Sequence, residues 1–413
     1  MKILLVHNTY QQPGGEDVVF DQERQFPSCA GHQVLTYCRS NLEIAGYSAL
    51  KLLALGGRMM WARDSRREIA GLLHEQKPDL VHAHNTFLMV SPSIYSACRE
   101  ADIPVVQTLH NYRLLCPAAT FFRHGGVCEE CLEHGLWRGV LHGCYRDSRG
   151  ETSAVALMLT VHRWLATWSE MVDCFIALSE FSRVKFIEGG IPAEKVVVKP
   201  NFVYADPGCR ARSGEYALFV GRLSPEKRVV TLLAAWQRLR VRVPLRIIGG
   251  GPERDSLEAH AKQMGLSDVR FFGQLPRDEV IAALKGARCL IFPSEWYENF
   301  PVTIAEAFAC GVPVIASRLG AMQEIVEDGR TGLHFKPGDA DDLAAKVEWA
   351  WTHPREMEEM GHMARAEYKA KYTAERNYEM LMEIYTKAIA ARGQGVFAEV
   401  RDDGIRPAVG RGC

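Results

Sequence analysis

Residues 293–313 read PSEWYENFPVTIAEAFACGVP and follow a short apolar run that is expected to be a strand. A helix is expected to begin near Pro301, because proline is favoured at the first helical position, where its missing N–H would be unpaired anyway. The free amides and the positive dipole end of such a helix start form an anion site. Glu298 lies in the loop and Glu306 on the helix, so two carboxylates flank the site and can accept hydrogen bonds from hydroxyl groups. The stretch therefore predicts a site for a ligand that carries both phosphate and sugar.

The whole chain has 413 residues, which is enough for two domains that each bury a full core. Its 49 basic and 50 acidic residues nearly balance, so composition gives no argument for nucleic acid as a partner. No stretch approaches the roughly 18 apolar residues of a membrane-spanning helix, and the N-terminal MKILLVHN predicts a buried strand, not a signal peptide. We therefore expect a cytoplasmic protein. In that compartment its 12 cysteines predict a metal site where they cluster, not a disulfide framework.

The N-terminal half alternates short apolar runs with helical stretches, a pattern typical of parallel βαβ units. In an open parallel sheet, ligands bind outside the carboxyl ends of the strands. A single histidine at such a position is more often structural than catalytic, but several on one edge favour a site. Three of the predicted strands end in a His-Asn pair: His7-Asn8, His84-Asn85 and His110-Asn111.

A glycine turn follows the first predicted strand at Gly14 and Gly15, where the backbone can approach a ligand closely. Glu16 and Asp17 come next and suit the start of a helix. Read alone, this segment is only a turn. A second glycine run, 249–251, follows a strand in the C-terminal half and permits close packing or close ligand approach, but it is not a dinucleotide fingerprint.

Turn-rich residues over 202–215 predict a linker, after which the alternation of strands and helices starts again. The loop after the first strand of this second half holds Gly221, Arg222 and Lys227. Arg222 offers a planar fork for phosphate, and Lys227 offers a mobile point charge. Both can face a crevice between the two halves, although two solvated surface cations would give the same pattern.

The regular alternation breaks over about 112–150, in an insertion that contains Cys116, Cys128, Cys131 and Cys144. One C-x2-C pair with two further cysteines close in sequence predicts a tetrahedral structural zinc site. His124, His134 or His142 could replace a thiol as a ligand or support the site from the second sphere. The alternative is four unconnected thiols.

Residues 152–168, TSAVALMLTVHRWLATW, predict one apolar helix. One interpretation is a helix of the core or of a domain face. The other is an amphipathic surface in peripheral contact with the inner membrane, supported by Trp137, Arg138, Arg146 and Arg149 nearby in sequence.

The motif Glu298-x7-Glu306, set in ENFPVTIAEAFACGVPVIAS, resembles the signature of retaining GT-B glycosyltransferases of family 4. A bare E-x7-E often only solvates a helix face, but the flanking NFP and GVP also match the family. The pair Arg222 and Lys227 resembles the diphosphate clamp of these enzymes. The pattern HNYRLLCP…C-x2-C…CYR is similar to that of related bacterial enzymes that build surface polysaccharides.

The resemblance implies an α/β fold of the GT-B type, with two Rossmann-like, doubly wound domains facing a central crevice. Residues 1–201 would form an acceptor-binding domain, with the Cys-rich insertion over about 112–150. The linker, 202–215, would lead into a nucleotide-sugar-binding domain over 216–390 that includes the C-terminal helices. Residues 391–413 lack periodicity and are expected to form a mobile tail.

The resemblance also implies the roles of the site residues. Catalysis would depend on Glu298, His110, Arg222 and Lys227, and the acceptor would enter beside His84, Asn85 and Asn111. No cofactor would be required for catalysis if two cations and a helix dipole stabilise the leaving diphosphate. The donor would contact Glu306, Arg222, Lys227, Gly14, Gly15, Gly221, Gly250, Leu275, Asn299, Phe300, Pro301 and Val302.

The predicted function is transfer of a sugar from a nucleotide-diphosphate sugar, with retention of configuration, to a hydroxyl of a glycan or polyprenyl-linked glycan acceptor. A sugar phosphorylase or synthase of the same fold would share the arginine, lysine and glutamate residues. An inverting enzyme of this fold would lack the E-x7-E motif in this loop. A binding module with an inactive site is the alternative without catalysis, and the intact set of charged residues argues against it.

Overall fold

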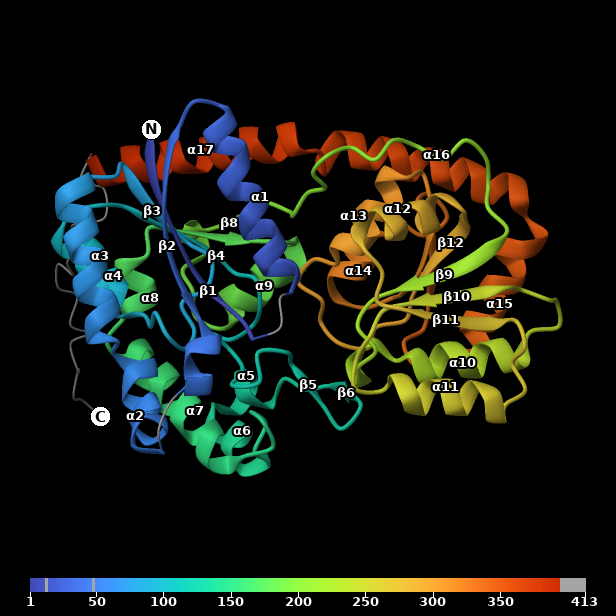
Figure 1. The fold of residues 1–413 in the computed structure, drawn as a ribbon, viewed down its shortest axis with the longest axis horizontal. Coiled ribbons are helices and arrows are strands. Elements are labelled where there is room, and N and C mark those ends of the chain that lie inside the picture. Colours follow the sequence, from blue (N-terminus) through green and yellow to red (C-terminus); the bar gives the residue numbers. More distant parts are fainter. Residues whose placement is uncertain (12–13, 47–48, 394–413) are drawn as a thin grey trace, which may run out of the picture.

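The computed structural model describes residues 1–11, 14–46 and 49–393, and it forms two α/β domains that lie side by side (Figure 1). Each domain is built on a six-stranded sheet in which every neighbouring pair of strands is parallel. This architecture confirms the predicted pair of Rossmann-like domains. Most of these strands are continuous buried apolar runs, as expected when helices cover both faces of a sheet.

The N-terminal sheet has the strand order β2-β1-β3-β4-β7-β8. Its strands are β1 (Lys2–Thr9), β2 (Gln33–Ser40), β3 (Leu80–Ala83), β4 (Val105–Thr108), β7 (Cys174–Ala177) and β8 (Val196–Val198). The helices of this domain are α1 (Gly15–Cys29), α2 (Ala49–Met60), α3 (Arg63–Gln76), α4 (Ser93–Glu100), α8 (Thr167–Met171) and α9 (Glu180–Glu188), with 3-10 turns η1 (Asn41–Gly46) and η2 (Ala193–Lys195).

The C-terminal sheet has the strand order β11-β10-β9-β12-β13-β14. Its strands are β9 (Tyr216–Val220), β10 (Leu245–Ile248), β11 (Val269–Gly273), β12 (Ala287–Phe292), β13 (Val314–Ser317) and β14 (Gly332–Phe335). The helices that follow these strands are η3 (Pro225–Lys227), α10 (Val229–Arg238), α11 (Arg254–Gln263), α12 (Arg277–Lys285), α13 (Val302–Ala309), α14 (Gly320–Ile325), α15 (Ala340–Thr352) and α16 (Pro354–Lys371).

The insertion consists of a small antiparallel hairpin and short helices. Its elements are β5 (Phe122–Arg123), β6 (Gly126–Val127), α5 (Glu130–His134) and α6 (Trp137–His142), and α7 (Arg149–Trp164) follows. The single helix predicted over 152–168 is wrong, because the chain breaks between α7 and α8 at Ala166, which has a φ of 51°. His162 stabilises the break, since its Nδ1 lies 2.9 Å from the hydroxyl of Thr167.

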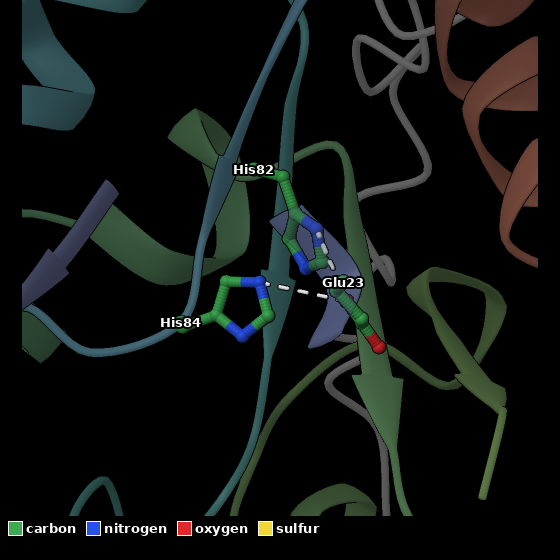
Figure 2. A group of neighbouring side chains, drawn as sticks. All are labelled: Glu23, His82 and His84. Carbon is green, nitrogen blue, oxygen red and sulfur yellow. Dashed lines mark ion pairs between the residues drawn. The ribbon is translucent and has the colours of Figure 1, made fainter. Parts of the chain in front are cut away.

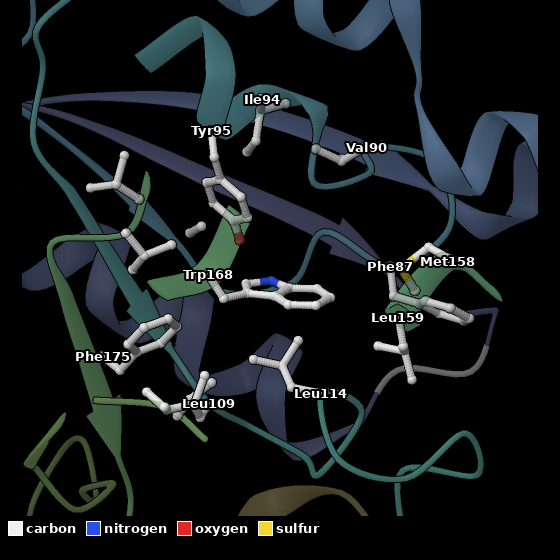
Figure 3. Close-up of a cluster of buried hydrophobic side chains, with 14 of the residues drawn as sticks. Phe87, Val90, Ile94, Tyr95, Leu109, Leu114, Met158, Leu159, Trp168 and Phe175 are labelled. Atoms are coloured by element: carbon white, nitrogen blue, oxygen red, sulfur yellow. The ribbon is translucent and has the colours of Figure 1, made fainter. Parts of the chain in front are cut away.

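The core of the N-terminal domain packs around Trp168, which lies among Tyr95, Leu109, Leu114 and Phe175 (Figure 3). The Tyr95 hydroxyl, buried in this core, donates a hydrogen bond to the side-chain oxygen of Gln107 at 3.0 Å. These contacts pack helices α4 and α8 against strand β4. The chain reaches His110 two residues after β4 ends.

The last helix, α17 (Ala374–Gly393), crosses from the C-terminal domain and lies along the N-terminal domain (Figure 1). Leu381 and Tyr385 of α17 pack with Ile3, Leu5 and Phe20 in a shared apolar cluster. The C-terminal part of the predicted 216–390 domain is therefore packed on the other domain. Residues 391–393 of the predicted tail belong to α17, and the rest of that tail lies outside the described residues. None of the described helices combines the length and the apolar character needed to cross a bilayer.

Candidate active site

The order of strands places the candidate site at the edge where both sheets end. In each sheet the chain changes direction once, between β1 and β3 in one domain and between β9 and β12 in the other. At such switch points the loops that follow neighbouring strands diverge and leave room for a ligand. The loops after β9 and β12 hold Arg222, Lys227 and Glu298, and those after β1 and β3 hold Gly14 and Asn85.

The loop after β12 also contacts the N-terminal domain. The Asn299 side chain donates to the carbonyl oxygen of Leu109 at 3.4 Å, and the Tyr297 hydroxyl donates to Glu129 at 2.6 Å. The Glu324 carboxylate accepts hydrogen bonds from the first two amides of α9, both at 2.9 Å. These contacts bring Glu298 and Asn299 beside the segment that carries His110.

Glu298 and Lys227 form an ion pair at the carboxyl edge of the C-terminal sheet. The Glu298 side chain is 8% exposed, and its Oε1 also accepts a hydrogen bond from the Ser294 hydroxyl at 2.9 Å. The Lys227 ammonium lies 5.3 and 5.4 Å from the ring centres of Phe292 and Trp296. The carboxylate therefore holds the lysine in place at the position where a phosphate is expected.

Arg222 and the start of α13 are open to a ligand. The Arg222 side chain is exposed and makes no hydrogen bond or ion pair with any residue that the structure describes. Helix α13 begins at Val302, one residue later than predicted, because Pro301 is the extended N-cap residue. No side chain caps this helix, so its first amides can bind an anion. Phe300, just before it, is buried against Tyr372 and fixes the direction of the loop.

Glu306 lies one turn into α13 with its side chain 15% exposed, and burial raises its pKa above the usual value. The nearby Arg277, at the start of α12, opposes this rise in pKa through a contact of 3.4 Å to Oε1. Sequence reasoning missed Arg277, since only the fold brings α12 beside α13. The pair presents a carboxylate and a guanidinium at the same edge of the sheet.

The glycine run 249–251 allows two backbone segments to pack closely. A Cβ on Gly249, which has a φ of 144°, would lie 1.9 Å from the carbonyl oxygen of Gly221, and one on Gly251 would lie 2.3 Å from that of Leu223. A Cβ on Gly250 would meet only Gln274, at 4.0 Å. The run therefore lets the turn after β10 pack closely against the loop that carries Arg222. Leu275, which was predicted to contact the donor, is half-buried and packs against an apolar cluster of the C-terminal domain.

Asn85 and Asn111 converge on a residue that was not predicted to belong to the site, Glu16. Their side-chain amides donate to the two Glu16 carboxylate oxygens at 2.9 and 3.4 Å. Burial, and next to it the Asp17 carboxylate, raise the pKa of Glu16 to about 8. Gly14 and Gly15 lie just before it, and the Gly14 amide donates to Asp17 at 2.7 Å. The sequence signal was present, since Glu16 directly follows the predicted glycine loop.

The histidines of the strand ends lie together but do not all face the crevice. His110 is half-buried, whereas His84 is 3% exposed and His7 is fully buried, which corrects the prediction of His84 as a residue of the acceptor surface. His84 lies beneath His110 instead, with 3.0 Å between His84 Nδ1 and His110 Nε2. Burial and the neighbouring imidazoles lower the pKa of both rings well below the usual value, so both are neutral at pH 7.

The four cysteines of the insertion gather in one part of the domain. Cys116 and Cys131 are buried, and Cys128 and Cys144 are partly exposed. Burial, and next to it the Cys116 thiol, raise the pKa of Cys131 to about 12. In the described part of the chain, only Glu23, His82 and His84 bring three such ligand atoms within 4.8 Å of one another. No three of the four thiols meet this spacing in the described ranges, and the structural zinc stays a prediction.

Two family models match the chain. A model described as Glycosyltransferase Family 4 matches residues 14–206, and one described as Glycosyl transferases group 1 matches residues 210–367. The glycogen synthase of Mycobacterium tuberculosis is 30% identical over 322 residues, which are 76% of this chain and 69% of the relative. The D-rhamnosyltransferase WbpZ of Pseudomonas aeruginosa is 33% identical over 161 residues, which are 38% of this chain and 42% of the relative.

Among solved structures, that of Alr3699/HepE from Anabaena in complex with UDP aligns with 94% of this chain and 100% of its own, with a TM-score of 0.69 and 20% identity. A sucrose-phosphate synthase from Thermosynechococcus elongatus aligns with 94% and 99%, with a TM-score of 0.70 and 18% identity. At these identities the likeness concerns the fold. Taken with the two family models and the glycogen synthase relative, it shows that the chain belongs to glycosyltransferase family 4 and has the GT-B fold.

Proposed function

We propose that the chain is a retaining glycosyltransferase that moves a sugar from a nucleotide-diphosphate sugar to a hydroxyl of a glycan or polyprenyl-linked glycan acceptor, in bacterial surface-polysaccharide synthesis. One observation carries the proposal: three features that suit a diphosphate lie together at one switch point. They are the exposed Arg222, the Lys227–Glu298 ion pair and the uncapped start of α13, and they lie opposite His110 and Glu16. The names of two relatives, a D-rhamnosyltransferase and an O-antigen chain mannosyltransferase, support this substrate class.

On the donor side, the positive charge for the leaving diphosphate would come from Arg222, Lys227 and the amides of α13. Lys227 would exchange its bond to Glu298 for a phosphate oxygen, which frees the Glu298 carboxylate to accept a hydrogen bond from a sugar hydroxyl. Glu306 would accept hydrogen bonds from the ribose hydroxyls. UDP and UDP-glucose are bound by the Anabaena protein, which shares this fold.

On the acceptor side, the partly exposed Glu16, His110 and Asn111 form a polar surface that suits a hydroxyl-rich acceptor, and Asn85, which is buried at 6% exposure, holds Glu16 from behind. In the reaction, the bond from the anomeric carbon to the diphosphate oxygen breaks, and a bond from the acceptor oxygen to the same face of that carbon forms. The acceptor proton would pass to the leaving phosphate, whose charge the two cations stabilise. Retention is carried over from the family by analogy.

The configuration of the released sugar tests this mechanism. The chain would be incubated with UDP-glucose, GDP-mannose or ADP-glucose, with water as the acceptor, and the anomeric proton followed by NMR from the first minutes. The proposal predicts that one donor is consumed and that its α-anomer forms first, before mutarotation. First formation of the β-anomer, or consumption at the wild-type rate in Lys227→Met, contradicts the proposal.

A second candidate is a synthase or phosphorylase that acts on a soluble glucan, which the similarity to a glycogen synthase favours. The products separate the two activities. A phosphorylase converts a glucan and inorganic phosphate into a sugar phosphate, and a synthase lengthens a soluble glucan without any lipid-linked acceptor. The proposed activity does neither.

We also propose that α6 and α7 contact the inner face of the membrane, where a lipid-linked acceptor resides. Exposed apolar side chains recur at helical spacing, namely Trp137 and Leu141 on α6 and Leu157 and Trp164 on α7, of which Trp164 is 82% exposed. The exposed Arg146 lies between the two helices, the exposed Arg149 begins α7, and both suit anionic headgroups. Co-sedimentation with phosphatidylglycerol vesicles should exceed that with phosphatidylcholine vesicles, and Trp164→Ser should weaken it. Equal sedimentation with both contradicts the proposal.

A further inference from the structure

A chain of buried polar groups lies directly beneath His110. His110 and His84 stack with 5.2 Å between ring centres, and their facing nitrogens, His110 Nε2 and His84 Nδ1, lie 3.0 Å apart. At this distance one of the two nitrogens donates the shared proton and the other accepts it. Both rings are neutral, so each has one donor and one acceptor nitrogen. The other nitrogen of His110, Nδ1, has no hydrogen-bond partner among the residues of the described ranges, so it is available to a ligand.

The other nitrogen of His84 faces Glu23 of α1 (Figure 2). His84 Nε2 and Glu23 Oε2 lie 3.5 Å apart, and neither atom has a hydrogen-bond partner elsewhere in the described residues. Both residues are almost fully buried, at 3% and 2% exposure. Buried polar atoms are rarely left unpaired, and a small movement of either side chain brings the two within hydrogen-bond distance.

The Glu23 carboxylate is held by a buried cation. The Lys199 ammonium is fully buried, lies 2.7 Å from Glu23 Oε1 and also donates to Asn377 at 3.3 Å. Lys199 therefore fixes one carboxylate oxygen. The other, Oε2, faces His84 Nε2 at 3.5 Å and His82 Nδ1 at 3.8 Å, and the Tyr385 hydroxyl already engages that nitrogen of His82. A carboxylate oxygen only accepts hydrogen bonds, so the nitrogen of His84 that faces it must be the protonated one.

The same atoms could be read as a metal site, because His82 Nδ1, His84 Nε2 and a Glu23 oxygen lie within 4.8 Å of one another (Figure 2). Two contacts argue against this reading. Both nitrogens of His82 are already engaged, Nδ1 with the Tyr385 hydroxyl at 2.7 Å and Nε2 with that of Thr108 at 2.8 Å. Lys199 also already balances the Glu23 charge, so a metal ion would leave buried positive charge uncompensated.

We propose that Glu23 is a positioning residue that sets the tautomers of His84 and His110. The proton on His84 Nε2 points to Glu23, so His84 Nδ1 accepts the proton of His110 Nε2, and His110 keeps an unprotonated Nδ1 for a substrate hydroxyl. The assignment of the tautomers follows from these contacts between rings that are both neutral. The use of Nδ1 in transfer rests on the function proposed above.

Glu23→Gln gives the sharpest test, because Lys199 fixes the orientation of the glutamine side-chain amide. The ammonium can only donate, so it keeps the amide oxygen, and the NH2 group faces His84 Nε2. That nitrogen must then accept, the proton moves to His84 Nδ1, and His110 becomes protonated at Nδ1. The full-length chain labelled with [15N]histidine would be studied by long-range 15N–1H NMR, which distinguishes the two tautomers of each ring.

The expected result is His110 protonated at Nε2 in the wild type and at Nδ1 in Glu23→Gln. Thr108→Val is the matched control, since it removes a hydrogen bond at His82 Nε2 from the same buried cluster and leaves the contacts among Glu23, His84 and His110 in place, and it should leave His110 protonated at Nε2. Wild-type His110 protonated at Nδ1 would overturn the proposal without any variant. An unchanged tautomer in Glu23→Gln, or a stoichiometric metal ion that elemental analysis finds in the wild type and not in this variant, would overturn it as well.

A second readout links the tautomer to the reaction. Release of UDP from UDP-glucose, or of GDP from GDP-mannose, should slow by about tenfold in Glu23→Gln, as for loss of one hydrogen bond to the substrate. The Kd of the free nucleotide should stay the same, because Glu23 lies in the other domain. If the tautomer of His110 switches but the rate of nucleotide release does not change, only the use of His110 Nδ1 in transfer is overturned. If the wild type releases neither nucleotide, the proposed function fails while the NMR result still decides the tautomer.

Discussion

The pKa of Glu16 depends on burial, which the sequence alone does not show. In the sequence it is an acidic residue at a helix start, which is ordinary. In the structure the two asparagines of the strand ends enclose it, and burial together with Asp17 raises its pKa to about 8. Lys227 is a similar case, since its role as a phosphate ligand was predicted but its pairing with Glu298 was not. Residue types at loop positions were predictable; the contacts between loops were not.

The raised pKa of Glu16 has a consequence for stability. The folded state favours the protonated carboxyl, so ionisation destabilises the fold increasingly as the pH rises from 4.5, the ordinary value, to about 8. Glu16→Gln keeps a neutral side chain, and its melting temperature should exceed that of the wild type by roughly 3–6 °C at pH 8.5. The difference should shrink toward pH 5 in thermal unfolding scans. A difference that does not depend on pH would show that Glu16 is not buried in this way.

Lys227→Met should slow nucleotide release by about a hundredfold, because it removes a charge that stabilises the leaving diphosphate. It should also destabilise the fold, since Glu298 would stay buried without its cation. The double variant with Glu298→Gln should recover stability but not the rate. Recovery of the rate as well would mean that Lys227 only neutralises Glu298.

At the level of elements, the repeated strand–loop–helix pattern was enough to predict both sheets and the ends of strands where ligands bind. Serine after a strand is favoured as a helix cap, and Ser179 caps α9 through a capping box with Ser182. The break at Ala166 could not be predicted from the residues around it. His162 stabilises the break, and the carbonyl oxygen of Met60, about a hundred residues away in the chain, holds His162 in place. Apolar periodicity continues through the break and hides it.

The glycine turn after β10 allows a matched pair of variants. Gly249→Ala places a Cβ 1.9 Å from a carbonyl oxygen at a φ of 144°, so it should lower the melting temperature strongly or prevent folding. Gly250→Ala meets nothing closer than 4.0 Å and should unfold at the wild-type temperature. Both would be measured by thermal unfolding followed by circular dichroism. Equal effects of the two would contradict the close packing of this turn against the Arg222 loop.

At the scale of the whole molecule, α17 connects the two domains. The sequence predicted charged helices at the C-terminal end, but the partner of an amphipathic helix cannot be read from its own residues. In the structure Tyr385 of α17 bonds to His82, Tyr378 to His32, and Arg392 to Asp173, all in the N-terminal domain. The predicted 216–390 domain included these helices, and in the structure α17 packs on the N-terminal domain.

Truncation after Thr373 should expose the apolar cluster formed by Ile3, Leu5 and Phe20 and leave the N-terminal domain aggregated or unfolded. Truncation after Gly393 is the control, because it retains every contact that α17 makes with the described residues, and it should melt at the temperature of the full chain. Light scattering and thermal unfolding would compare the two. A folded, monomeric product of the shorter truncation would show that α17 is dispensable for the N-terminal core.

The central claim is that the carboxyl edge of the C-terminal sheet binds a nucleotide diphosphate through Arg222 and Glu306. Calorimetric titration of UDP, GDP and ADP into the wild type, Arg222→Ala and Glu306→Ala tests it most directly. Arg242→Ala is the control, because Arg242 precedes β10 and so lies at the opposite edge of the sheet, where it pairs with Asp268. One nucleotide should bind the wild type and the control alike, and its affinity should fall by about tenfold in each of the other variants. Binding of none of the three, or equal binding to all four proteins, would contradict the claim.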